Sequence, residues 1–179
     1  IVAIWGSCPE RGRCENIFSD RGLRLSSPAS IPAQRVRSIN FSNVLLALAK
    51  PVLDSGTFIV NVNAGPSQYA GKQCSPLFFS ASFQNDTAPE AMGIYMQDKG
   101  IKRVYLMAPN YPAGKDFLAG FKRYFKGEIV DEVYTAFGQL DYAAEIAQLR
   151  DKRPDAVFFF YPGGMGINFV KQYAQAGLK

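Results

Sequence analysis

From residue 39 onward, short apolar segments alternate with longer amphipathic segments, and this alternation limits the folds that the chain can adopt. The apolar segments are rich in β-branched and aromatic residues, as in AVFFFY at 156–161, and are typical of buried strands. The amphipathic segments repeat their apolar residues with the period of a helix, as in DYAAEIAQLRD at 141–151. Strands and helices that alternate in this way build parallel sheets with helices on both faces. The sequence therefore predicts an α/β fold.

The same pattern predicts where each element lies. We expect helices over residues 43–56, 86–99, 114–125, 141–151 and 165–177, and strands over residues 57–62, 77–83, 103–108, 128–135 and 156–161. Ser42 is expected to cap the first helix and Asp141 the fourth, because such side chains accept hydrogen bonds from first-turn N–H groups. Either Asp86 or Thr87 is expected to cap the second helix. Pro51 is expected to kink or shorten the first helix, since proline lacks the N–H.

The sequence lacks the residues of several common catalytic and zinc sites. The 179-residue chain has no histidine, which excludes Ser-His-Asp and Cys-His catalysis and histidine-ligated zinc. Its three cysteines, Cys8, Cys14 and Cys74, form no C-x-x-C pair and are too few for an all-cysteine zinc site. Asp131 and Glu132 are neighbours on an expected strand, so they should point to opposite faces of the sheet. We expect no catalytic residue, metal or cofactor.

Two glycine-containing turns come near to nucleotide-binding motifs but do not match them. The turn 163–166 lacks the third glycine of the dinucleotide fingerprint, because Phe169 stands in its place. The turn 114–116 has the Gly-Lys pair of a P-loop, but it lacks the Ser or Thr that should follow the lysine and the glycine that should lie five residues before Gly114. The sequence therefore contains no recognisable phosphate-binding motif.

Residues 1–38 differ in composition from the rest of the chain. They hold six arginines, no lysine and three acidic residues, and they follow neither a helical nor a strand period. One interpretation is a basic arm that binds nucleic acid, since the net charge of the whole chain is +5. The charges do not cluster, however, which favours a poorly structured segment or one foreign to this domain, for instance through a shifted reading frame. We expect no nucleic-acid partner and no function in this segment.

Ligands of open parallel sheets bind outside the carboxyl ends of the strands, where helix N-termini present backbone N–H groups. Four turns of this chain lie at such places. They contain the candidate binding residues Ser42, Asn43, Asn63, Ala64, Gly65, Asn110, Tyr111, Tyr161, Pro162 and Gly163. A structural interpretation is also open, in which the glycines only permit tight turns and the tyrosines are ordinary rim aromatics.

Several long stretches resemble a known family. They are the runs VNVNAGPS at 60–67, FFSASFQND at 78–86, APNYPAGKDFLAGFKRYFKGEIV at 108–130, and the whole of 138–178. These stretches are similar to the type 1 periplasmic solute-binding proteins of ABC transporters, in the leucine/isoleucine/valine-binding group. Within that group the resemblance is closest to members that bind aromatic or other small carboxylates. It covers residues 39–179, and residues 1–38 depart from it.

The resemblance implies a fold of two Rossmann-like lobes, each with parallel sheets and helices on both faces, of which this chain holds an incomplete part. Residues 1–38 stay unassigned, residues 39–86 form part of lobe I, and residues 87–179 form the first part of lobe II. The family's location is the periplasm, although residues 1–13 show no secretory leader. The chain is accordingly expected to be a piece of a longer protein.

The resemblance also implies a binding site between the lobes. Lobe I would hold the carboxylate of a branched-chain amino acid or an aromatic acid through Ser42 with Asn43 and through the loop of Asn63, Ala64 and Gly65. Lobe II would close over the ligand body through Asn110 and Tyr111 and through the turn of Tyr161, Pro162 and Gly163. A membrane permease would be the protein partner. The alternatives are a ligand-sensing effector domain of the same fold and, disfavoured by the missing motifs, an α/β enzyme.

Overall fold

The computed structural model describes residues 41–178, so the expectations for residues 1–38 lie outside the described part. The described chain divides into two compact units, the first ending at Gln84 and the second beginning at Asn85. This division falls two residues before the boundary that the sequence predicts between residues 86 and 87. No helix among the described residues is long and apolar enough to cross a membrane.

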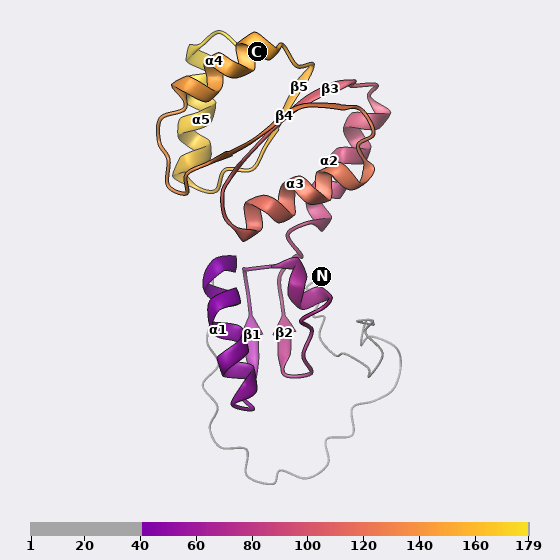
Figure 1. The fold of residues 1–179 in the computed structure, drawn as a ribbon, viewed down its shortest axis with the longest axis vertical. Helices are drawn as coiled ribbons and strands as arrows, with labels where there is room; N and C mark the ends of the chain where they lie inside the picture. Colours follow the sequence, from indigo (N-terminus) through magenta and orange to yellow (C-terminus); the bar gives the residue numbers. More distant parts are fainter. Residues whose placement is uncertain (1–40, 179) are drawn as a thin grey trace. The chain divides into compact units, whose positions relative to one another are not determined.

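The first unit is a two-stranded parallel sheet covered by one helix (Figure 1). Its elements are α1 (Ser42–Asp54), β1 (Ile59–Asn61), the 3-10 helix η1 (Ser67–Ala70) and β2 (Phe78–Ser80). β1 and β2 pair in register from Ile59 opposite Phe78 to Asn61 opposite Ser80. The core consists of Leu45, Ala49, Ile59, Ala64, Tyr69 and Phe78. The helix therefore buries one apolar stripe against the sheet.

The ends of these elements differ from the sequence prediction. Phe41, with an extended backbone, occupies the N-cap position, and Ser42 is the first helical residue rather than the cap. The helix continues beyond Pro51 to Asp54, so the proline does not end it. Gly56 follows the helix with φ +76°, a conformation that suits glycine. Both strands are shorter than expected, because their pairing runs only from Ile59 opposite Phe78 to Asn61 opposite Ser80. The 3-10 helix η1 was not expected.

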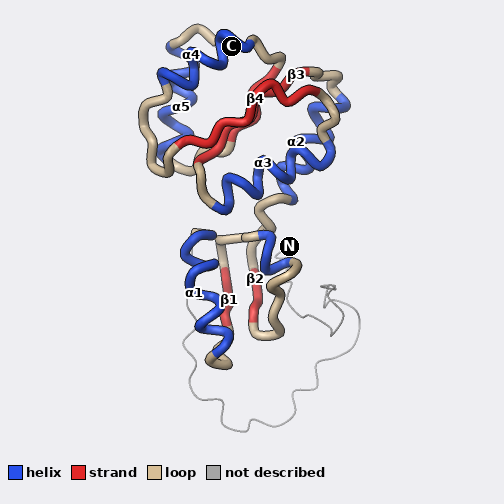
Figure 2. The backbone as a smooth tube through the Cα atoms, viewed as in Figure 1, coloured by secondary structure: helices blue, strands red, loops and turns tan. Residues whose placement is uncertain are grey.

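The second unit is a three-stranded parallel sheet between two layers of helices (Figure 2). Its elements are α2 (Thr87–Asp98), β3 (Arg103–Pro109), α3 (Pro112–Tyr124), β4 (Glu128–Thr135), α4 (Ala143–Lys152), β5 (Ala156–Phe159) and α5 (Gly164–Gln175). The strand order is β4-β3-β5, with β3 in the centre and buried from Val104 to Pro109. The predicted α/β fold with parallel sheets is confirmed.

Alternate residues of the central strand pack on opposite helical layers, as strand geometry requires. Val104 and Leu106 belong to the core that also contains Leu118 and Phe121 of α3. Tyr105 and Met107 belong to the core formed with α4 and α5. The neighbouring acidic residues of β4 diverge in the same way: Glu132 pairs with Lys122 of α3 at 2.6 Å, and Asp131 lies 3.9 Å from Lys152 of α4.

Two expected caps are used differently. Asp86 occupies the N-cap position of α2, but its carboxylate binds the guanidinium of Arg123 instead of a first-turn N–H. Tyr142, not Asp141, is the N-cap residue of α4, although Asp141 Oδ1 still accepts a hydrogen bond from the Ala143 N–H at 3.1 Å.

Two other elements of this unit have different ends from those expected. α3 begins two residues earlier than expected because Pro112 is preorganised for the first turn. β5 ends at Phe159, where its pairing with β3 stops.

Helices α2 and α3 approach each other closely through two glycines. A Cβ atom at Gly93 would collide with the carbonyl oxygen of Phe121, and a Cβ atom at Gly120 would collide with that of Asp86. Larger side chains at either position would force the helices apart. The glycines therefore set the spacing of this helical layer.

Candidate ligand-binding site

In the first unit, the N-terminal end of α1 lies at the same end of the sheet as the carboxyl ends of β1 and β2 (Figure 1). Ser42 is buried at the first helical position, and the neighbouring Asn43 is exposed. The first turn of a helix directs N–H groups along the axis and carries a partial positive charge. This end of the unit therefore has the polarity that favours an anion.

The loop after β1 is shaped by Asn61, a residue that the sequence analysis did not single out. Asn61 is fully buried, and its side-chain amide donates to the Ala64 carbonyl and, at 3.1 Å, to the Ser80 hydroxyl. Ser82 Oγ donates to the Asn63 carbonyl at 2.7 Å. Asn63 itself is exposed, whereas Ala64 and Gly65 are buried. The sequence signal that could have identified Asn61 is its position as a polar residue at the end of the apolar run TFIVN.

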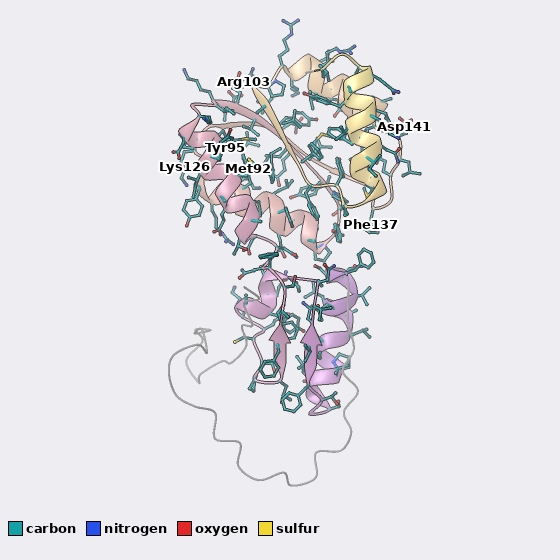
Figure 3. The ribbon with its side chains drawn as sticks, turned by 180° about the vertical axis from the view of Figure 1, so that it is seen from behind. Met92, Tyr95, Arg103, Lys126, Phe137 and Asp141 are labelled. Atoms are coloured by element: carbon teal, nitrogen blue, oxygen red, sulfur yellow. The ribbon has the colours of Figure 1, made fainter. Side chains whose placement is uncertain are left out.

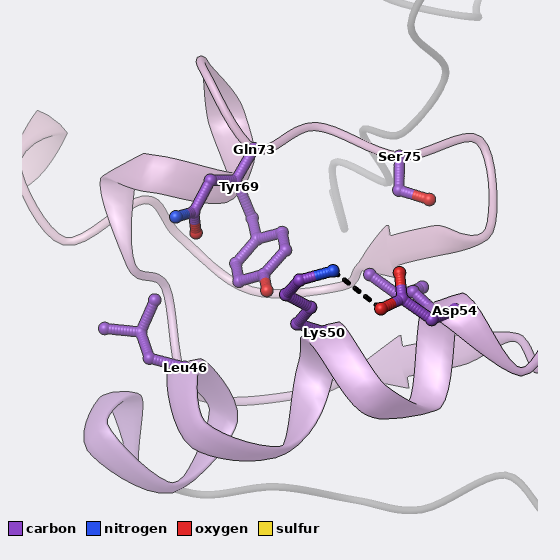
Figure 4. Close-up of a pocket in the computed structure, with 7 residues that line it drawn as sticks. Leu46, Lys50, Asp54, Tyr69, Gln73 and Ser75 are labelled. Atoms are coloured by element: carbon purple, nitrogen blue, oxygen red, sulfur yellow. Dashed lines mark hydrogen bonds and ion pairs between the residues drawn. The ribbon is translucent and has the colours of Figure 1, made fainter.

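A pocket of about 370 Å³ also lies in the first unit, along the later part of α1 (Figure 4). Its lining is Leu46, Lys50, Leu53, Asp54, Tyr69, Gln73 and Ser75. Lys50 Nζ pairs with Asp54 Oδ2 at 2.6 Å beside the Tyr69 hydroxyl, and this contact raises the pKa of Lys50. The lysine charge is thus already matched, and none of the candidate binding residues lines this pocket.

In the second unit, Asn110 and Tyr111 join the end of β3 to the start of α3. The Asn110 N–H donates to the Thr135 carbonyl at 2.8 Å, which links the ends of β3 and β4. Tyr111 is the N-cap residue of α3, with an extended backbone and a half-buried side chain. Burial raises the pKa of the Tyr111 hydroxyl to about 12, so the group is neutral near pH 7 and can donate a hydrogen bond.

The turn after β5 contains Tyr161, Pro162 and Gly163. Tyr161 is only 7% exposed, and its ring packs 4.9 Å from that of Tyr142 and 5.3 Å from that of Phe169. Burial raises the pKa of its hydroxyl, an effect that the neighbouring Thr135 hydroxyl partly opposes. Pro162 is half-buried, and Gly163 is exposed with φ +57°. The positive φ explains the glycine structurally.

The structure brings Tyr111 together with three rings that the sequence analysis did not select. Phe160, the residue before Tyr161, stacks near Tyr111 on the α3 side of the sheet, and Phe117 stacks on Phe160. Phe137, in the loop after β4, also contacts the Tyr111 ring. Neighbouring residues of an extended chain point to opposite faces, so Phe160 joins this group while Tyr161 lies in the other core.

The candidate residues therefore fall into two sets, each at the carboxyl edge of a parallel sheet in its own unit. One set contains Ser42, Asn43, Asn63, Ala64 and Gly65, and the other contains Asn110, Tyr111, Tyr161, Pro162 and Gly163. Among residues 41–178, no group of three or more acidic, cysteine or histidine side chains could hold a metal ion. Helix N-termini, strand-end loops and aromatic surfaces are features of a protein that binds small molecules.

Comparison with known proteins identifies the family of this chain. The chain belongs to the periplasmic binding protein family, which matches residues 36–179. "Leu/Ile/Val-binding protein homolog 6" of Brucella melitensis is 29% identical over 134 residues, which are 72% of this chain and 34% of that protein. The resemblance to leucine/isoleucine/valine-binding proteins noted in the sequence is confirmed.

Solved structures agree with this assignment. The solute-binding protein of an ABC transporter from R. palustris, in complex with benzoate, is 31% identical with a TM-score of 0.76, over 80% of this chain and 41% of that one. A solute-binding protein from Rhodopseudomonas palustris BisB5, in complex with 3,4-dihydroxybenzoic acid, is 32% identical with a TM-score of 0.72, over 79% and 39%. The chain thus spans about two-fifths or less of the length of these relatives.

Proposed function

We propose that this chain forms part of the substrate-binding component of an ABC transporter, which captures a small carboxylate in the periplasm and delivers it to a membrane permease. The observation that carries the proposal is the pair of sheet edges described above, in a fold shared with proteins of 31% and 32% identity whose structures hold benzoate and 3,4-dihydroxybenzoic acid. The activity is reversible capture by closure of two lobes, without turnover.

The first unit is proposed to be part of lobe I and to hold the carboxylate. Ser42 and Asn43 stand at the positive end of α1, where an anion is stabilised by the helix dipole and by N–H donors. The loop of Asn63, Ala64 and Gly65 lies at the end of the adjacent strand and supplies further backbone donors. Asn61 is proposed to act indirectly: its buried side-chain amide donates to the Ala64 carbonyl and so fixes the conformation of this loop.

The second unit is proposed to be the first part of lobe II and to cover the body of the ligand. Asn110 and Tyr111 offer a polar side chain and a half-buried ring at the N-terminus of α3. Pro162 and Gly163 shape the turn into α5. Tyr161 is proposed as a contact from the same turn, although most of its surface packs in the core.

A thermal-shift titration of the complete gene product tests the proposal. Benzoate, 3,4-dihydroxybenzoate, leucine and isoleucine form the panel, and at least one should raise the melting temperature with increasing concentration, by mass action. Benzyl alcohol is the control for benzoate, since it keeps the ring and lacks the carboxylate. A melting temperature that no acid changes, or an equal rise with benzyl alcohol, would contradict carboxylate capture.

A further inference from the structure

Four aromatic rings form a row at the carboxyl edge of the second unit's sheet. The ring centroids of Phe117 and Phe160 are 3.7 Å apart, with planes inclined by 15°. Phe160 and Tyr111 follow at 6.4 Å and 16°, and Tyr111 and Phe137 at 4.9 Å and 55°. Phe117 lies within α3, and Tyr111 is the N-cap residue of the same helix. Phe160 directly follows β5, and Phe137 lies in the loop after β4.

The last ring of this row is the most exposed. Phe117, Phe160 and Tyr111 are half-buried, whereas the side chain of Phe137 is 53% exposed. Phe137 lies in the loop between β4 and α4, at the edge of the second unit (Figure 3). Its ring therefore ends the row at the sheet edge where parallel α/β folds bind their ligands.

The loop that carries Phe137 is held in place on both sides of the ring. The Gln139 N–H donates to the Ala136 carbonyl at 3.2 Å, and the Ala136 N–H donates to Gln139 Oε1 at 3.3 Å. Gly138 adopts φ +88°, and its N–H lies 3.4 Å from Met165 Sδ. An exposed ring on a turn fixed in this way is preorganised and loses little freedom when a ligand packs on it.

We infer that Phe137 is a specificity-determining residue, whose ring packs against the aromatic body of a carboxylate ligand and favours it over a branched aliphatic one. This inference rests on the proposed function. Two aromatic rings in an offset or edge-to-face arrangement attract each other beyond the effect of apolar burial, and an aliphatic group lacks that additional attraction. Phe137 would thus distinguish ligands that share the same carboxylate.

Isothermal titration of the complete gene product with benzoate and with leucine tests this role. Phe137→Leu keeps an apolar side chain but removes the ring, and it should raise the Kd for benzoate about 3- to 10-fold, the range expected from loss of an aromatic pair. The Kd for leucine, where it binds, should change less than about 2-fold on the same reasoning. Phe137→Tyr keeps an aromatic ring and should bind benzoate with the affinity of the wild type. Ile94→Ala, at an exposed apolar residue in the middle of α2, should change neither affinity.

Circular dichroism melting of each variant shows that it folds. The inference is overturned if Phe137→Leu leaves benzoate affinity unchanged, or weakens benzoate and leucine equally. It is also overturned if the wild-type protein binds leucine or isoleucine but no aromatic acid, a result that leaves the proposed function intact. A wild-type protein that binds none of these acids would refute the proposed function, and the inference with it.

Discussion

The side-chain amide of Asn61 lies 3.1 Å from the hydroxyl of Ser80, so the ends of β1 and β2 are joined through side chains as well as through backbone pairing. The same amide donates to the Ala64 carbonyl, and Asn61 is fully buried. One side chain therefore connects strand pairing to the conformation of the loop that we propose for carboxylate binding.

Asn61→Ala should lower the free energy of unfolding by about 1–3 kcal/mol, because the buried Ala64 carbonyl and Ser80 hydroxyl lose a donor. Urea unfolding of the complete gene product measures the change. Lys72→Ala is the matched control, since Lys72 is exposed in the same unit, and it should shift stability by less than about 0.5 kcal/mol. Equal stability of the two variants would show that the Asn61 amide does not stabilise this loop.

Ser42→Ala should weaken binding of the best carboxylate in the panel by about 1–2 kcal/mol, or roughly 5- to 30-fold, as expected for the loss of a hydrogen bond to a charged group. Isothermal titration measures the affinity. Ser55→Ala, just beyond the opposite end of α1, is the control and should leave affinity unchanged. If both variants bind like the wild type, Ser42 does not belong to the site.

Gly120→Ala should destabilise the protein by about 1–3 kcal/mol, although alanine is the better helix former. The added Cβ would collide with the carbonyl oxygen of Asp86 and push α3 away from α2. Gly164→Ala, at the first position of α5, places its Cβ in open space and should be neutral or slightly stabilising. Thermal melts of both variants check the contrast, and a neutral Gly120→Ala would contradict the close helix contact.

Arg123→Met should cost about 2–3 kcal/mol of stability, because the carboxylate of Asp86 is 2% exposed and would lose its positive partner. The cost should lie below that of a fully buried pair because Arg123 is half-exposed. Adding Asp86→Asn should recover part of the loss by removing the unpaired charge. Lys115→Met, at an exposed residue of the same helix, is the control. Urea unfolding that shows no recovery would argue against the ion pair as the cause.

The fold could be predicted from the sequence because the information for it is local. Every predicted helix and strand is present, and β4 has the predicted bounds, residues 128–135. The ends of β1, β2 and β5 could not be predicted, because a strand ends where its neighbour stops pairing, as β5 does opposite Met107. The end of such a strand therefore depends on a partner strand that is distant in sequence.

The candidate site was harder to predict for a similar reason. The run FFFYP gives no indication of which ring faces which layer, and the structure places Phe160 with Tyr111 and Tyr161 with Tyr142. Asn61 owes its role to Ser80, nineteen positions away in the chain. Phe137 looks like an ordinary loop residue until the turn around it is known. The turns themselves were identified correctly, since strand ends and helix starts can be read locally.

The row of rings from Phe117 to Phe137 also has an optical consequence. The single tryptophan of the chain, Trp5, lies outside the described residues, so phenylalanine and tyrosine are the aromatic near-ultraviolet chromophores of residues 41–178. Aromatic side chains give a near-ultraviolet circular dichroism band only when tertiary packing fixes their surroundings. Tyr111 lies between Phe160 and Phe137, so its contribution to the shared tyrosine signal should change when a small molecule occupies that edge of the sheet.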